Sequence, residues 1–258
     1  MKRLGGILAR WSLLIALLIV WEVLAHSGAF TPFMLPPPKV VARRIWSDAM
    51  TGDLFINAGL TLYRALTGFA IAAVLGILIG MLMCRNAGVR WFLDPIVSVM
   101  FPMPKITFLP VIVLWLGFYD VAKISMVVFD AIFPVIAGTI IGIRGIEKEL
   151  IWSARNMGAR EDELLRQVLL PAAMPQIMTG LQVALPIALI VAVIAEMMMG
   201  GYGMGGAMVE ASRSTDSPGV FAGIVEIAVV GYAAVRAMAK IRARLLAWHP
   251  ESQHISAF

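Results

Sequence analysis

The sequence predicts an all-α membrane protein with about six transmembrane helices. Of its 258 residues, 60% are hydrophobic and only 14% are charged, whereas a soluble domain carries about 25% charged residues on its wetted surface. The mean hydropathy is +0.87. A helix needs about 20 mostly apolar residues to span a bilayer. Six stretches meet that length, namely 11–30, 62–84, 96–118, 122–143, 177–199 and 219–238.

We expect a single transmembrane domain over residues 1–258. Residues 1–60 form an N-terminal helix and an external segment, 61–240 a five-helix core, and 241–258 a tail. The first helix has an alternative interpretation as a cleaved signal peptide, because Lys2 and Arg3 give it a basic head. Trp21 and Glu22 fit a cleavage region poorly, which favours a retained helix.

The lysines and arginines indicate the orientation. If the N-terminus is cytoplasmic, most of the 21 basic residues fall on the cytoplasmic side, as the positive-inside rule requires. Both termini and the loop 145–176 are then cytoplasmic. The external segment 31–61 contains a proline run followed by a predicted short helix over 40–50, since proline is well suited to the first turn of a helix. A glycine-rich stretch over 200–206 predicts a flexible external loop.

Several function classes are excluded by what the sequence lacks. One cysteine, Cys84, and three histidines without ligand spacing predict no metal site and no disulfide. The sequence contains no GxxxxGK[ST] pattern, so no nucleotide site is expected. We assign the net charge of +5 to cytoplasmic loops rather than to nucleic-acid binding. No catalytic residues are predicted, because no Ser-His, Cys-His or paired-His arrangement lies within the spans.

The loop 145–176 is unusually charged for this chain and predicts two short helices. The first ends at Gly158, which suits the left-handed position that closes a helix. The second begins near Glu161, carries acidic residues in its first turn and ends at Pro171. Its apolar side would lie against lipid headgroups or dock into a partner's groove. Acidic rather than basic residues in the first turn favour docking.

The same loop contains a spaced motif. Trp152-Ser153-Ala154 is followed after three residues by Gly158 and after nine more by Val168-Leu169-Leu170-Pro171. This spacing resembles the cytoplasmic motif of the permeases of binding-protein-dependent ABC importers, which has Glu-Ala-Ala first and Ile-x-Leu-Pro last. This chain therefore departs from the motif in placing Trp152, Ser153 and Val168 where the family has Glu, Ala and Ile.

Further segments are similar to the nitrate, sulfonate and taurine branch of that family and cover nearly the whole chain. They are LPPPKVV at 35–41, TLYRALTGF at 61–69, LDP at 93–95, PKITFLPVIVLWLGF at 104–118, ARNMGA at 154–159, LLPAAMPQIMTGLQVAL at 169–185 and VAVIAEMM at 191–198. The resemblance implies a type I ABC importer permease fold, a multi-pass location in the bacterial inner membrane, and a homodimer. It also implies separate ABC ATPase subunits that use ATP and Mg²⁺, a periplasmic solute-binding protein, and no cofactor in this chain.

The resemblance makes the loop 145–176 the coupling helix that contacts the ATPase. The candidate coupling residues are Ala154, Gly158, Ala159, Glu161, Leu164, Leu165, Val168, Leu170 and Pro171. The missing motif Glu puts one ATPase contact in question, but not the docking itself.

Four charged residues and one neutral polar residue within the predicted spans are candidates for the translocation pathway, because a polar or charged group in the bilayer is costly and is usually functional or paired. They are Lys105, Asp130, Gln182, Glu196 and Glu226. Lys105 and Asp130 lie on consecutive spans and are expected to form an ion pair; otherwise Lys105 faces the pathway. Gln182 is expected to form a helix–helix hydrogen bond. Three acids against one lysine mean that the acids are paired or that the cargo is positively charged.

The sequence therefore predicts the transmembrane subunit of an ATP-driven importer for a small solute, of the nitrate, sulfonate or taurine kind. A self-contained secondary transporter or channel is the alternative, although such proteins often contain paired half-repeats that are not evident here.

Overall fold

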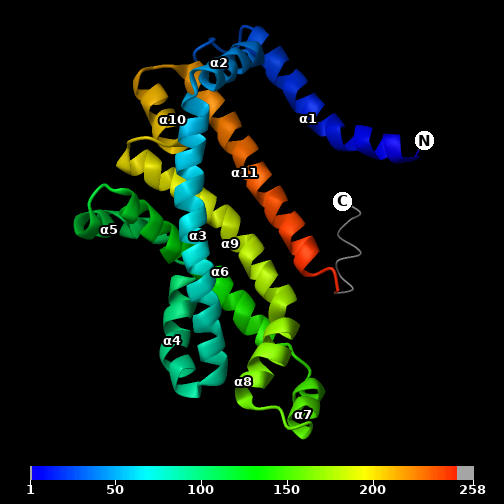
Figure 1. The fold of residues 1–258 in the computed structure, drawn as a ribbon. Coiled ribbons are helices and arrows are strands. Elements are labelled where there is room, and N and C mark those ends of the chain that lie inside the picture. The colour runs from blue at the N-terminus through cyan, green and yellow to red at the C-terminus, as the bar shows by residue number, and fades with distance from the viewer. Residues whose placement is uncertain (1, 249–258) are drawn as a thin grey trace. The chain divides into compact units, whose positions relative to one another are not determined.

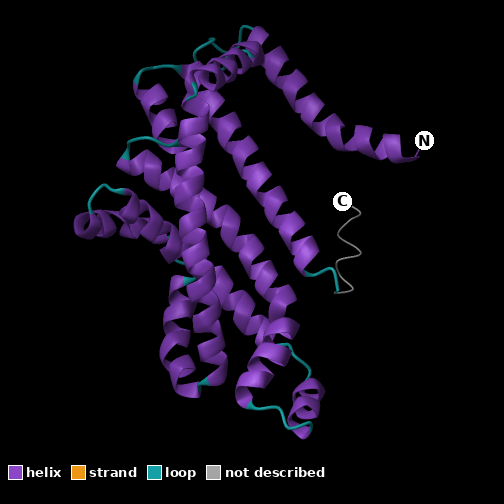
Figure 2. Ribbon diagram, viewed as in Figure 1, coloured by secondary structure: helices purple, strands orange, loops and turns teal. Residues whose placement is uncertain are grey.

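The computed structural model describes residues 2–248, with side chains from Ser12 onward, and this part of the chain contains helices and loops but no strand (Figures 1 and 2). The long helices are α1 (Lys2–His26), α3 (Asp53–Arg85), α6 (Asp120–Arg144), α9 (Leu170–Met199) and α11 (Ser217–Leu245). Shorter ones are α2 (Pro38–Thr51), α4 (Ala87–Met100), η1 (Lys105–Phe108), α5 (Leu109–Leu116), α7 (Lys148–Asn156), α8 (Glu161–Glu163), η2 (Leu164–Leu169) and α10 (Met204–Arg213).

The chain forms two compact units. Unit 1 comprises residues 1–60 and 196–229, and unit 2 comprises residues 61–195 and 230–258. Four continuous helical segments are long and apolar enough to cross a bilayer, namely Asp53–Arg85, Asp120–Arg144, Glu161–Met199 and Ser217–Leu245. These confirm four of the six predicted spans. In α1 the apolar segment with described side chains, Ser12–His26, is shorter than a span.

The predicted span 96–118 is wrong as a single straight helix. It is a pair of helical segments, Ala87–Met100 and Lys105–Leu116, bent by 98°. Asn86 starts the first segment because its Oδ1 accepts from the backbone N–H groups of Gly88 and Val89, at 2.8 and 3.2 Å. Pro102 and Pro104 lie at the break and lack the N–H groups that a continuous helix would use.

Within unit 2, α3 and α6 pack closely through a row of glycines on α3. A Cβ atom added to Gly68, Gly76 or Gly80 would lie 2.6–2.7 Å from Val127, Val135 or Thr139, respectively. The residue number of the contact on α6 increases as the residue number of the glycine on α3 increases, so the two helices run parallel. Two parallel spans require the chain between them to cross the bilayer once. The bent α4–α5 pair is therefore one broken crossing rather than a re-entrant loop.

On its other side α6 packs against α9, again through small residues. A Cβ atom on Gly138 would lie 2.9 Å from Gly180 Cα, and one on Gly142 would lie 2.9 Å from the Ala173 carbonyl oxygen. Here the residue number on α9 falls as the residue number on α6 rises, so α6 and α9 are antiparallel. Small residues at helix crossings are how membrane helices approach closely in the absence of a hydrophobic driving force.

The prediction that Pro171 ends a helix is wrong. Residues Glu161–Met199 form one continuous helical segment that passes through Pro171. The segment widens into a π-helix over Leu164–Leu169, in which the N–H of Leu170 bonds to the Leu165 carbonyl five residues back. We infer that this wider turn accommodates the proline ring, which in a regular α-helix would clash with the carbonyl four residues earlier.

The glycine row on α3 gives a prediction about stability. Replacing Gly76 with Ala places a methyl group 2.7 Å from Val135 Cβ and 3.1 Å from the Ile132 carbonyl, so the helices must separate. We expect a loss of about 1–3 kcal/mol, typical of overpacking, seen as a lower thermal midpoint of the detergent-purified protein.

Gly59 on the same helix is the matched control, because a Cβ there meets nothing within 4 Å. Gly59→Ala should be neutral or slightly stabilising, since alanine is the better helix former. Equal midpoints for the two variants would argue against the close α3–α6 contact.

Candidate functional site

The loop 145–176 turns sharply after α7, and the turn depends on Gly158. This residue has φ of +86°, the left-handed conformation that the sequence predicted. Its N–H bonds to the Arg155 carbonyl at 3.0 Å, and the N–H of Ala159 bonds to the Ala154 carbonyl at 3.1 Å. Together these bonds form a Schellman motif that satisfies the last carbonyls of α7. The spacing from Ala154 to Gly158 is therefore the spacing of a helix terminus.

Acidic residues begin the helical segment after this turn, as expected for a helix N-terminus. Glu163 Oε2 accepts from the Arg160 N–H at 2.8 Å, and Glu161 Oε1 lies 3.1 Å from Arg155 Nη2 on α7. The second contact is an exposed ion pair, worth at most about 1 kcal/mol. It nevertheless links the end of α7 to the start of α8 across the turn.

The predicted coupling residues are not all on the surface. Ala154 and Leu164 are buried, whereas Gly158, Glu161 and Pro171 are exposed, and Ala159, Leu165, Val168 and Leu170 are half-buried. The buried members help to hold the loop against the ends of α3 and α6. A cavity of about 240 Å³ lies between the loop and these two helices. It is lined by Met81, Cys84 and Arg85 of α3, Ile143 of α6, and Ile151, Arg155, Glu161, Leu164, Leu165 and Leu169 of the loop.

Three apolar side chains on the outside of the loop were missed as candidates from the sequence. Leu150, Trp152 and Met157 are 48%, 57% and 82% exposed. Leu150 and Met157 are seven residues apart, which is two turns of one helix face. Large exposed apolar side chains on a charged loop are the expected form of a docking surface, with anchors at the centre and charges at the rim.

Lys105 and Asp130 form the predicted ion pair, with Nζ 2.9 Å from Oδ1. Gln182 also makes the predicted helix–helix contact, since Arg242 Nη1 of α11 donates to its Oε1. Arg242 was expected in the tail, but α11 extends to Leu245. Both contacts lie within unit 2.

Glu196 is fully buried and contacts the N-terminus of α10 in unit 1. Its Oε2 accepts from the Gly205 N–H at 3.1 Å, and a Cβ on Gly203 would collide with the carboxylate. The Gly203 N–H donates to Asn57 Oδ1 at 2.9 Å. The predicted flexible loop over 200–206 is therefore shorter than expected, because α10 already begins at Met204. Glycine is needed at 203 for close approach to an acid that stabilises the helix N-terminus.

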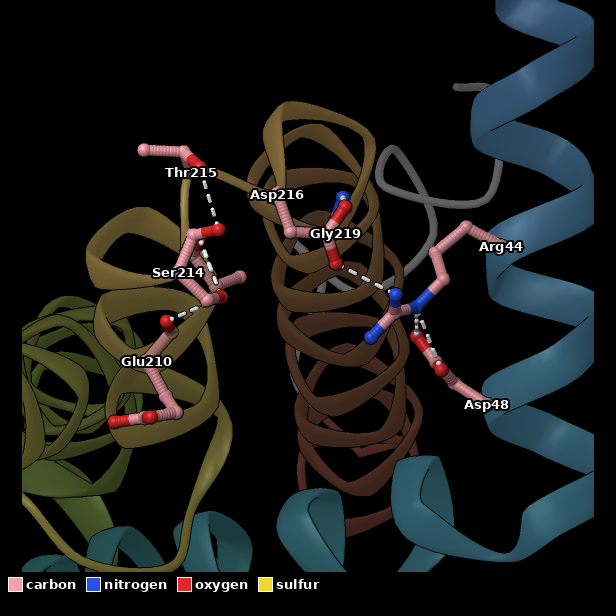
Figure 3. Close-up of polar contacts among 8 residues, drawn as sticks. Arg44, Asp48, Glu210, Ser214, Thr215, Asp216 and Gly219 are labelled. Atoms are coloured by element: carbon pink, nitrogen blue, oxygen red, sulfur yellow. Dashed lines mark hydrogen bonds and ion pairs between the residues drawn. The ribbon is translucent and has the colours of Figure 1, made fainter.

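Arg44 connects α2 to the start of α11 in unit 1 (Figure 3). Its Nε lies 2.9 Å from Asp48 Oδ1, and its Nη1 lies 2.6 Å from Asp216 Oδ2. Asp216 also caps α11 by accepting from the Gly219 N–H at 3.0 Å. Burial by itself would lower the pKa of Arg44, but the hydrogen bonds and charges of Asp48 and Asp216 raise it overall. The arginine therefore remains charged.

Glu226 of α11 lines a second cavity, which lies within unit 1 and has a volume of about 250 Å³. Its Oε1 is buried and has no hydrogen-bond partner among the residues whose side chains are described. The cavity is also lined by Arg44, Asp48, Asp53, Glu210 and Asp216. Among the five pathway candidates, Glu226 is thus the one with a fully buried side-chain oxygen that no described residue bonds.

The sequence matches known transport proteins over most of its length. Residues 72–246 match the family described as binding-protein-dependent transport system inner membrane component. The chain is 33% identical to the aliphatic sulfonates transport permease protein SsuC of Bacillus subtilis, over 90% of this chain and 84% of that protein. It is 30% identical to the taurine transport system permease protein TauC of Escherichia coli, over 93% and 89%.

The fold matches solved importer structures. A chain of the MetNI methionine ABC transporter in an inward-facing conformation superposes with a TM-score of 0.59 at 19% identity, covering 74% of this chain and 98% of that one. The helices, the broken span and the loop 145–176 thus form a type I importer permease fold. The chain belongs to the family of inner-membrane permease components of binding-protein-dependent transport systems.

Proposed function

We propose that this permease forms the translocation pathway for a small sulfonate-like solute and is driven by a separate ABC ATPase. In this proposal both termini and the loop 145–176 are cytoplasmic, a periplasmic binding protein delivers the solute, and two copies of the chain enclose the pathway. The observation that carries the coupling role is the rigid turn at Gly158, which presents Trp152 and Met157 outward.

The way the loop is seated supports a mechanical role. Leu164 and Ile151 share a cavity wall with Met81 of α3 and Ile143 of α6, and the loop continues without interruption into α9. A displacement of the loop therefore acts on three packed spans at once, since packed interiors transmit strain. ATP and Mg²⁺ would be used by the partner, not by this chain.

The charge pattern is compatible with an anionic or zwitterionic cargo. The sequence left open whether the acids are paired or the cargo is positive. Asp130 is paired with Lys105, and Glu196 accepts from the backbone at the start of α10. Similarity to permeases named for sulfonates and taurine favours a sulfonate. Glu226 is the acid that we retain as a pathway residue, because its buried oxygen has no partner.

Co-purification tests the ATPase partnership against a self-contained transporter. The tagged chain, extracted from its native membranes in mild detergent, should carry an ABC ATPase and hydrolyse ATP. Trp152→Ala should lower the amount of bound ATPase by about tenfold, since aromatic anchors are frequent hot spots. Tyr202→Ala is the control, because Tyr202 is also exposed but lies in unit 1. Solute uptake in vesicles without any ATPase would refute the importer assignment.

Gly158 tests the coupling role of the loop. A non-glycine residue at φ of +86° is strained by about 1–2 kcal/mol, so Gly158→Val should distort the turn. We expect the variant to reach the membrane, while ATP hydrolysis no longer drives uptake. The measurement is the ratio of solute transported to ATP hydrolysed in proteoliposomes.

Gly158→Asn is the matched control, because asparagine tolerates the left-handed conformation and a Cβ there meets nothing within 4 Å. It should retain most of the coupling. A normal ratio in Gly158→Val would show that the turn geometry does not matter for coupling.

A further inference from the structure

The break between α4 and α5 leaves backbone carbonyls without their helical donors. In a continuous helix the Met103 carbonyl would accept from the N–H of Thr107, but that N–H bonds to the Pro104 carbonyl at 3.2 Å. Pro102 and Pro104 also lack the N–H groups that a helix would direct at the carbonyls of Ser98 and Met100. The Met103 carbonyl is thus available to another donor, and the Phe101 carbonyl lies at the same break.

The side chain of Lys105 supplies that donor. Its Nζ lies 3.4 Å from the Phe101 carbonyl oxygen and 3.3 Å from the Met103 carbonyl oxygen. The ammonium folds back over the break it follows. An ammonium has three N–H groups, and two of them reach these carbonyls.

Residues of α6 make the remaining contacts of the Lys105 ammonium. Asp130 Oδ1 lies 2.9 Å from Nζ, and the ammonium lies 5.1 Å from the centre of the Phe133 ring. Lys105 is only 5% exposed. Its charge is thus neutralised and covered, so in this arrangement it is not presented to an anionic solute.

The break that Lys105 bridges lies within a membrane crossing. Because α3 and α6 are parallel, the α4–α5 pair crosses the bilayer. Irregular backbone within a crossing is tolerated where it is buried in protein or lines a watery path. Phe101, Pro102 and Pro104 are exposed, so the described part of the chain does not cover the outer surface of the break.

We propose that Lys105 is a positioning residue, which holds the backbone of residues 101–104 in the bent form that transport requires. In this proposal the solute meets the 101–104 segment, not the Lys105 charge. Asp130 serves to keep the ammonium in place. The proposal rests on the proposed function, and it assigns the broken span, rather than a charged side chain, to the pathway wall.

Paired substitutions separate this role from a simple ion pair. Lys105→Met combined with Asp130→Asn removes both charges and leaves no buried charge unpaired, but it withdraws the donor from both carbonyls. We expect the maximal transport rate to fall by about tenfold with little change in KM. The single variant Lys105→Arg, which keeps both the hydrogen-bond donors and the charge, should retain most of the wild-type transport rate.

Two transport results with this double variant would overturn the proposal. A wild-type rate in the Lys105→Met/Asp130→Asn variant would mean that only charge balance matters. A raised KM for anionic cargo with an unchanged maximal rate would instead place Lys105 in an anion site.

A second variant covers the case in which the first does not fold. Pro102→Ala combined with Pro104→Ala restores two N–H groups and favours a straighter helix. This variant should keep or raise its thermal midpoint and yet transport about tenfold more slowly. Transport at the wild-type rate would contradict a need for the bend.

A readout without transport separates failure of the inference from failure of the proposed function. Amide hydrogen exchange over residues 101–109 is measured in the purified protein in lipid nanodiscs. Lys105→Met/Asp130→Asn should exchange faster there than wild type, whether or not the wild type proves to be an importer. Equal exchange would overturn the positioning role, whereas faster exchange in a protein without ATP-driven uptake would overturn only the proposed function.

Discussion

The bilayer requires every backbone polar group in a crossing to find a partner within the protein, and this requirement explains most of the irregular features of this chain. Three irregular positions show how the chain meets this requirement. Lys105 serves the carbonyls beside Pro102 and Pro104. A π-turn precedes Pro171. Glu196 accepts from the start of α10. Two polar side chains that look like pathway residues in the sequence, Lys105 and Glu196, thus bond to backbone instead.

Glycine and other small residues allow the membrane-spanning helices to pack closely. Gly68, Gly76 and Gly80 bring α3 against α6, while Gly138 and Gly180 bring α6 against α9. Close packing makes these three spans one mechanical body in unit 2, and the loop 145–176 is joined to it through α9. The loop shares a cavity wall with α3 and α6, so under the proposed function an ATPase bound to the loop would act on all three spans.

The sequence predicts the helical class, four uninterrupted spans, the short helix α2 and the left-handed Gly158, because each depends on local composition or periodicity. It also predicts the Lys105–Asp130 pair and the Gln182 contact, since few partners exist for polar groups in apolar spans. The break at residues 101–104 and the passage of a helix through Pro171 were not predicted. Proline allows a bend, a stop or a wider turn, and tertiary partners decide between them. The exposure of Trp152 likewise depends on which face of α7 is buried.

The central claim is a topology in which α4 and α5 make one broken crossing and the loop 145–176 lies on the cytoplasmic side. Single cysteines at Asn86, Tyr119 and Asn156, in a Cys84→Ser background, can be labelled with an impermeant thiol reagent in sealed membranes of known orientation. The account predicts that positions 86 and 156 react from the cytoplasmic side and position 119 from the opposite side. Labelling of positions 86 and 119 from the same side would contradict it.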